Sequence, residues 1–393
     1  MSIKSPIWLT AAIGLLAIVS ASFGQEEQWL QYQSSRDASS VLKDISAYYL
    51  ELISERPEGA ALPDFKEDNP FFYKWSSPMT QNGYLLIASD STEKGGARDL
   101  LYIDSNGDGN LKDEPAIQAY QAERQHSYFG PVKVTFEGKD GPITYHLNFR
   151  LCNHNKRPLM VSSAGWYEGT ITVGEAKKHC VLIDYDVNGT FNDKSIKSFN
   201  KCDRIRVGEE GTSNTRFVGN YIEIDGALYR LEVARDGAYI KIAKAQDVVF
   251  GNIRLPETIS EFAAGGENGL FIFKPERGAG RLPVGKYCVE HWNIERKDEE
   301  GNNWKLEGRL FGSAGVFDVN AEKEAELSIG EPAISSLEVA DEGGGNYYIS
   351  QNLAGRLGER IELTCNGDRP PAPKLHIKSE DGEYDRTFAF AYG

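Results

Sequence analysis

Short alternations of apolar and polar residues, separated by turn residues, fill most of this chain. The clearest runs before residue 250 are Tyr84–Ala88, Leu100–Ile103, Val132–Phe136, Thr144–Leu151, Thr170–Val173, His179–Ile183, Tyr221–Ile224, Leu228–Val233 and Tyr239–Ile242. A period of two places alternate side chains on opposite faces of a strand. The dipeptides Asp225-Gly226 and Asp236-Gly237 separate the last three runs and are strong hairpin signals. The pattern predicts a mostly β protein.

One stretch near the N-terminus has a helical period instead. Between Ala38 and Ile53 the apolar residues recur at intervals of three and four, Asp37 offers an N-cap, and Arg56-Pro57 offers a stop. The spacing predicts one N-terminal helix over this stretch. Its second half, Tyr48–Ile53, also fits a strand, because aromatic and branched residues suit a pleated surface.

The chain after residue 250 continues in strands and turns. Its runs are Leu270–Phe273, Tyr287–Ile294, Trp304–Leu306, Ala325–Ile329, Leu337–Val339, Arg360–Thr364, Lys374–Ile377 and Thr387–Phe390. Short strands between Gly and Pro turns indicate a β-sandwich. We therefore expect a β-rich region over residues 25–250 and one or more sandwich-like domains over 251–393. The step from Leu282 to Tyr287, Leu-Pro-Val-Gly-Lys-Tyr, resembles a turn of prealbumin-like and Cna-B-like surface modules.

The first residues predict the compartment. Lys4 precedes an apolar run from Ile7 to Val19, and Ser22 and Gly24 place small residues before a cleavage point at Gln25. This order is typical of a secretory signal peptide, here residues 1–24, and the run is too short for a membrane span. No later segment is apolar enough to span a bilayer. We expect a secreted protein, periplasmic or extracellular.

The formal net charge is −15. An acidic chain lacks the basic footprint that nucleic acid and anionic membrane surfaces require. It suits a protein that meets divalent cations.

Two acidic loops follow predicted strands and carry the strongest chemical signal. The first begins at Asp104, directly after Leu100–Ile103, and the second begins at Asp184, directly after His179–Ile183. Each has side-chain oxygens at alternate positions, a glycine at the sixth position and an apolar residue at the eighth. This is the spacing of a loop that wraps calcium. Hairpin and loop recur in two units, around residues 84–115 and 166–195, which indicates an internal duplication.

Both loops resemble those of EF-hands, dockerins and thrombospondin type 3 repeats. The candidate ligands of the first loop are Asp104, Asn106, Asp108, the carbonyl of Asn110, and Asp113 or Glu114. Those of the second loop are Asp184, Asp186, Asn188, the carbonyl of Thr190, and Asn192 or Asp193. Position twelve is Pro115 or Ser195, so the usual closing glutamate is missing, and no flanking helix pair is evident. We expect two structural calcium ions, with the first loop contributing more to stability. A metal-free Asx-rich turn is the alternative.

Other constellations are weaker. Cys152, His154, His179 and Cys180 suggest a zinc site, but a Cys152–Cys180 disulfide or unpaired core thiols fit the compartment better. The remaining cysteines are Cys202, Cys288 and Cys365. Trp166-Tyr167, Trp292 and Trp304 are either a sugar platform or core residues.

Nucleophile elbows, phosphate loops and dinucleotide fingerprints do not occur in this sequence. The whole pattern resembles uncharacterised secreted bacterial β-proteins. It predicts a binding, cell-surface or structural role, with a carbohydrate or a cell-surface protein as partner, rather than an enzyme. The alternative is a secreted, polysaccharide-active hydrolase that uses the calcium loops as scaffold.

Overall fold

The structure is a computed structural model that describes residues 26–43, 45–139, 141–153 and 158–392. It is mostly β, with 53% of residues in strands and 3% in helices, so the predicted fold class is confirmed. The expected signal peptide lies outside the described residues. Within the described residues, no helix is long and apolar enough to cross a membrane.

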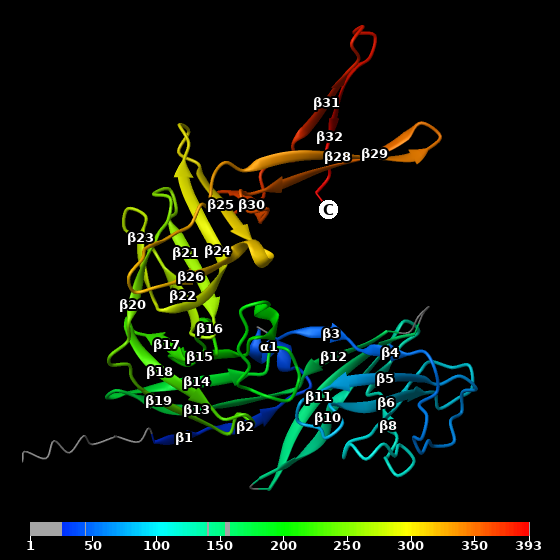
Figure 1. Cartoon of the computed structure of the whole chain (residues 1–393). Helices are drawn as coiled ribbons and strands as arrows, with labels where there is room; N and C mark the ends of the chain where they lie inside the picture. Colours follow the sequence, from blue (N-terminus) through cyan, green and yellow to red (C-terminus); the bar gives the residue numbers. More distant parts are fainter. Residues whose placement is uncertain (1–25, 44, 140, 154–157, 393) are drawn as a thin grey trace, which may run out of the picture.

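Two five-stranded antiparallel sheets form the half of the N-terminal body that carries the first acidic loop (Figure 1). In spatial order, one contains β4 (Glu51–Ile53), β5 (Phe71–Ser76), β6 (Tyr84–Asp90), β7 (Leu100–Ile103) and β8 (Ile117–Gln118). The other contains β3 (Ala47–Tyr49), β12 (Leu159–Ser163), β11 (Gly141–Cys152), β10 (His126–Gly138) and β9 (Gln121–Ala122).

Two more sheets form the half that carries the second loop. The first contains β16 (Thr215–Phe217), β15 (Arg204–Gly208), β14 (Ala176–Ile183), β13 (Gly165–Val173) and β2 (Gln31–Ser34). The second contains β1 (Glu27–Trp29), β19 (Tyr239–Lys244), β18 (Ala227–Val233) and β17 (Tyr221–Ile224). The expected hairpins are present: Asp225 and Gly226 have φ of 51° and 74° between β17 and β18, as a tight turn requires.

One hydrophobic core joins these four sheets. It runs from Leu30 to Ile240 and includes Trp75, Tyr145 and Phe191, all with at most 1% of their surface exposed. A second core begins at Ile253 and ends at Ile361. The core therefore changes near the expected boundary at residue 250, while the division into domains itself remains a prediction.

Two sheets enclose the second core, as the predicted sandwich requires. A small sheet contains β23 (Ala279–Pro283), β20 (Phe250–Arg254) and β27 (Ala325–Glu326). A large sheet contains β22 (Gly269–Phe273), β21 (Glu261–Gly266), β24 (Gly285–Lys297), β25 (Asn303–Arg309), β30 (Arg360–Cys365), β29 (Asn346–Ala354) and β28 (Ile334–Gly343), and β26 (Val316–Val319) pairs with β24. Short 3₁₀ turns occur at Phe199–Lys201 and Gly312–Gly315.

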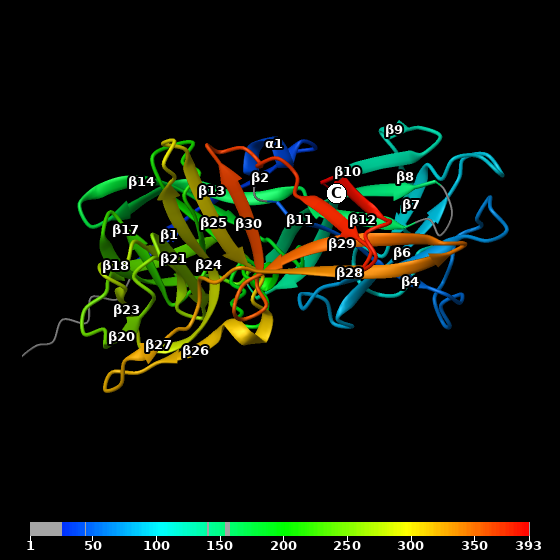
Figure 2. The ribbon, with the colours of Figure 1, turned by 90° about the horizontal axis from the view of Figure 1, so that it is seen from above.

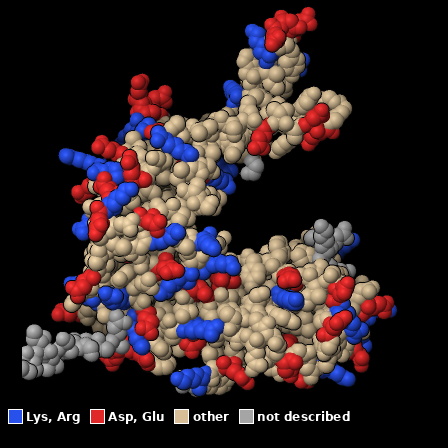
Figure 3. Space-filling model, viewed as in Figure 1, with Lys and Arg blue, Asp and Glu red and all other residues tan. Residues whose placement is uncertain are grey.

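Two hairpins project from this sandwich. The β28–β29 hairpin extends over the N-terminal body, and a separate hairpin of β31 (Lys374–Lys378) and β32 (Asp385–Ala389) points away from it (Figure 1). The view from above shows both hairpins crossing over the N-terminal sheets (Figure 2). The space-filling view shows a hollow between the β28–β29 hairpin and the body (Figure 3).

The predicted N-terminal helix is largely wrong. Helix α1 covers only Ala38–Leu42, whereas Ala47–Tyr49 and Glu51–Ile53 form β3 and β4. The alternative of a strand over Tyr48–Ile53 is therefore confirmed, with a break at Leu50. Tyr48 pairs with Val161 of β12, and Leu52 pairs with Tyr73 of β5. Hydrogen bonding to two neighbouring strands stabilises the extended conformation more than the helical spacing stabilises a helix. Leu50, between the two strands, is 7% exposed.

Candidate metal centre

Both acidic loops start where a hairpin strand ends. The first follows β7, which pairs with β6, and the second follows β14, which pairs with β13. The eighth-position residues Leu111 and Phe191 are 0% and 1% exposed, so both loops are anchored in a core as expected. The strand, loop and anchor recur in the same order, which agrees with a duplicated unit.

The two loops also share their backbone geometry. Positions four and six have positive φ in both: 75° and 81° at Gly107 and Gly109, 56° and 91° at Val187 and Gly189. The first-position carboxylate, Asp104 or Asp184, accepts hydrogen bonds from the N–H groups of positions five and six. These bonds curl each loop around its first carboxylate.

In the second loop, carboxylates converge from two strands. Each of Asp184, Asp186 and Asp203 offers an oxygen within 4.8 Å of the others. Asp193 lies beside them, because its backbone N–H donates to Asp203 at 2.7 Å and its carboxylate accepts from Asn188 Nδ2 at 2.9 Å. Among the described residues, this is the one group of three or more His, Cys, Asp or Glu that could hold a metal ion.

Asp203 is a functional candidate that the sequence analysis missed. The antiparallel pair β14–β15 places Ile183 opposite Arg204. Asp184 and Asp203 therefore face each other one step beyond the paired residues, since one follows β14 and the other precedes β15. The available signal was an acidic residue directly before the alternating run Arg204–Gly208, which the reading of the sequence did not treat as a strand.

Burial and mutual repulsion govern the protonation of this cluster. Asp184 and Asp203 have 0% of their surface exposed. Burial, followed by the charge of Asp186, raises the pKa of Asp184 to about 8. Burial, followed by Asp193, raises the pKa of Asp186 to about 6, although Lys201 lowers it. Burial and the charges of Asp184 and Asp193 also raise the pKa of Asp203 well above its ordinary value. A cation among these oxygens would remove both penalties.

The donor set suits a hard cation. The cluster presents carboxylate oxygens, and Asn188 Oδ1 lies within the same loop, where it accepts from the N–H and the hydroxyl of Thr190. Oxygen-only sets favour calcium, magnesium or manganese over zinc. Asp186 Oδ1 is buried and has no hydrogen-bond partner in the structure, so it retains full capacity as a ligand.

Three other strands hold the second loop in place. Tyr145 of β11 donates its hydroxyl to Asp184 Oδ2 at 2.8 Å. Trp75 of β5 donates its indole N–H to the Val187 carbonyl at 2.8 Å, and Tyr48 of β3 donates to the same carbonyl at 3.4 Å. The loop thus connects its own sheet to both sheets of the other half of the body.

The first loop gathers fewer carboxylates. Asp104 is 3% exposed, and burial raises its pKa, whereas Asn106, Asp108 and Asp113 are exposed. Glu114, whose pKa burial also raises, accepts from the backbone N–H of Ser105 at 2.7 Å. The structure therefore favours the second loop as the candidate metal site, whereas the sequence favoured the first loop.

Most of the cysteine and aromatic residues considered above have structural positions. All five cysteines are unpaired, so the Cys152–Cys180 disulfide is absent and the alternative of unpaired core thiols is confirmed for Cys180, which is 0% exposed in the first core. Burial raises the pKa of Cys180 to about 12. His154 lies outside the described residues. Trp166, Tyr167 and Trp292 are 6%, 8% and 0% exposed and belong to the cores. Trp304 donates its indole N–H to Asp298 at 2.9 Å.

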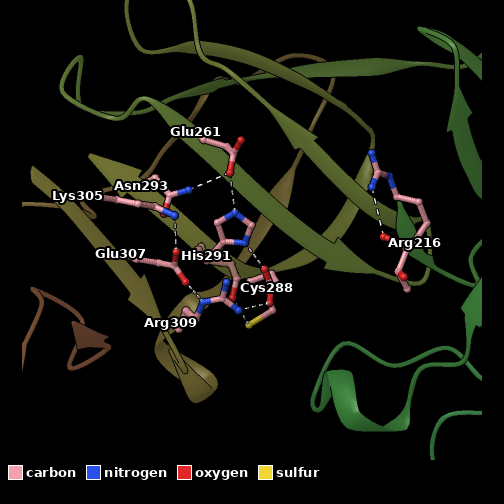
Figure 4. Close-up of polar contacts among 11 residues, drawn as sticks. Arg216, Glu261, Cys288, His291, Asn293, Lys305, Glu307 and Arg309 are labelled. Atoms are coloured by element: carbon pink, nitrogen blue, oxygen red, sulfur yellow. Dashed lines mark hydrogen bonds and ion pairs between the residues drawn. The ribbon is translucent and has the colours of Figure 1, made fainter. Parts of the chain in front are cut away.

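A second polar cluster lies on the large sheet of the sandwich (Figure 4). A bulge between Ala263 and Ala264 places Glu290 and His291 of β24 on the same face. His291 lies between Glu290 and Glu261, with 3.2 Å from Nε2 to Glu261 Oε1. Burial lowers the pKa of His291, but the hydrogen bonds to both glutamates outweigh it and raise the pKa. The cluster offers its carboxylates to opposite ring nitrogens, so it does not surround a single ion.

Comparison with protein-family models, with curated proteins and with solved structures found no match for this chain.

Proposed function

We propose that this protein is a secreted β-protein that calcium stabilises through the second acidic loop, and that its role is binding at a cell surface or in a structural assembly. The observation that carries the metal is the convergence of Asp184, Asp186 and Asp203 at one buried point. Two buried carboxylates and one half-buried carboxylate, all with raised pKa values, are costly to assemble unless a cation or protons neutralise them. At neutral pH a divalent cation does so without protonating the ligands.

The ion would act as a structural tie. Asp184 and Asp203 follow and precede neighbouring strands, and Asp184 also accepts from Tyr145 of another sheet. A cation at this point fixes the β14–β15 connection and, through the Val187 carbonyl, the position of β5. The first loop would hold a second, weaker ion, with Asp104 as its buried ligand.

A binding role agrees better with the surface than a hydrolase does. Among the described residues, the surface pockets of about 680 and 490 Å³ each have a single carboxylate in their lining, Glu295 and Glu232. A glycosidase requires a pair of carboxyl groups about 5–10 Å apart across its substrate. The projecting hairpins, in contrast, expose apolar side chains such as Val339, which is 62% exposed.

Thermal unfolding in calcium and in chelator tests the metal. The melting temperature should fall on chelation, recover with calcium, and recover less with magnesium, which demands a tighter octahedral shell. An identical melt in calcium and in chelator would refute the proposal.

A further inference from the structure

The β28–β29 hairpin, residues 334–354, which we call the arm, has an apolar face whose outer part nothing in the described structure covers. Its register pairs Val339 with Ile349 and Leu337 with Gln351 on this face. Leu353 lies on the same face at the base of the arm, where it packs against the second core. Leu337 and Val339 are 53% and 62% exposed. The strands β28 and β29 of the large sheet thus extend beyond the second hydrophobic core.

The β31–β32 hairpin, residues 374–389, which we call the C-terminal hairpin, has a similar face. Leu375 pairs with Phe388, and Ile377 pairs with Arg386, so these four side chains share one side of the ribbon. Phe388 is 43% exposed. An isolated two-stranded ribbon is marginal in water, and an uncovered apolar face marks a site of association.

Charge determines which surface each ribbon fits. The strands of the arm carry Glu338, Asp341 and Glu342 and no Lys or Arg. A contact between two arms would therefore bring acid to acid.

The strands of the C-terminal hairpin carry the opposite balance. They contain Lys374, Lys378 and Arg386 against one acid, Asp385. The other acids of this hairpin, Glu380, Asp381 and Glu383, lie in the turn at its tip. Each apolar face also holds a single charged residue, Asp341 on the arm and Arg386 on the hairpin, of opposite sign.

We propose that the occupant of the arm is the C-terminal hairpin of a second copy of this chain, with the contact repeated reciprocally. The two ribbons of one chain project in different directions (Figure 1) and are joined by a segment that contains Pro370, Pro371 and Pro373. A two-fold dimer lets each arm meet the other copy's hairpin and buries both apolar faces twice in a closed assembly. This surface is separate from the metal cluster.

Light scattering on a sizing column, in calcium, tests the assembly. The wild-type chain should be a dimer, and Val339→Glu or Phe388→Glu should weaken dimerisation about tenfold or more, because each places a charge in the apolar contact. Ala340→Glu and Thr387→Glu are matched controls on the opposite faces and should leave the dimer intact. Both pairs should keep the wild-type calcium-dependent melt, which shows that the chains fold.

A charge exchange distinguishes the arrangement within the dimer. Asp341→Lys and Arg386→Asp should each weaken self-association, and a mixture of the two variants should form heterodimers, since one of the two contacts then has an intact pair and the other an exchanged pair. Asp341 also accepts from the Gly343 N–H at 2.7 Å, so Asp341→Asn, which retains an acceptor, controls for the turn.

Three outcomes would overturn the proposal. One is a monomeric wild-type chain, whether or not it binds phosphatidylcholine vesicles. Another is a dimer that Val339→Glu and Ala340→Glu weaken equally. The third concerns the double variant that carries Asp341→Lys and Arg386→Asp in one chain. If each single change lowers the melting temperature and the double variant recovers it as a monomer, the contact is intramolecular.

Discussion

Asp186 offers the sharpest test of the metal centre, because its substitution should have opposite effects with and without calcium. Its Oδ1 atom has no hydrogen-bond partner among the described residues, and its Oδ2 accepts from the Asn188 side chain at 3.2 Å. Asp186→Asn therefore removes a charge from the cluster without removing an acceptor from a backbone N–H. In chelator, the variant should be at least as stable as the wild type, since repulsion with Asp184 is relieved.

In calcium the order should reverse. Extracellular calcium modules have dissociation constants of about 10⁻⁴ to 10⁻³ M, so about 10 mM calcium stabilises a single site by about 1.4–2.7 kcal/mol. A cooperative unit of about 150–250 residues gains about 2–4 °C per kcal/mol, which gives a shift of about 3–11 °C. The variant should lose most of this shift.

Differential scanning calorimetry in calcium and in chelator measures both effects. Asp318→Asn, an exposed acid on β26, is the matched control and should keep the full shift. Asp203→Asn should lose the shift but also destabilise the metal-free protein, because the Asp203 carboxylate accepts from the N–H groups of Tyr185 and Asp193. If Asp186→Asn keeps the calcium shift, or destabilises both forms equally, the assignment of Asp186 as a ligand is refuted.

Four further outcomes follow from the same structure. The metal-free protein should lose stability as pH rises from about 4 to about 8, because the raised pKa of Asp184 means that the folded state binds more protons than the unfolded chain, and calcium should flatten this dependence in pH-resolved melts. Asp108→Asn in the exposed first loop should reduce the calcium shift less than Asp186→Asn does, as the same calorimetry will show. Trp75→Phe should cost about 1–3 kcal/mol in urea unfolding, because it leaves the Val187 carbonyl without its indole donor. His291→Gln should destabilise the protein more below the ordinary His pKa than well above it, because the stabilisation from a raised pKa is lost as pH rises through the folded value, and calcium should not alter this difference.

The strands could be predicted because local alternation and burial agree along most of the chain. Leu100–Ile103 and Tyr221–Ile224 have the bounds that the pattern predicted. After Leu42 the sequence left two alternatives, a helix by period and a strand by residue type over Tyr48–Ile53. Pairing decides between them, since β3 pairs with β12, more than a hundred residues away in sequence. Propensity is a weak guide where a distant sheet edge competes.

The candidate site was predictable only in part, for a related reason. Loop spacing identified Asp184 and Asp186, since local turns bring them together. Asp203 enters through the register of β14 with β15, which no spacing motif encodes. The greater weight of the second loop also depends on neighbours such as Tyr145 and Trp75, which reach it from other sheets.

The pairing of β1 has a consequence for how the chain folds. Glu27 pairs with Lys241 and Trp29 with Tyr239, so the first strand of the body can pair only after the last strand has been synthesised. During synthesis, β1 has no partner until more than two hundred further residues have been made. Long-range pairing of this kind slows folding and leaves strand edges open to aggregation in the interval. We therefore expect the pairing of β1 with β19 to be a late step in the folding of the N-terminal body.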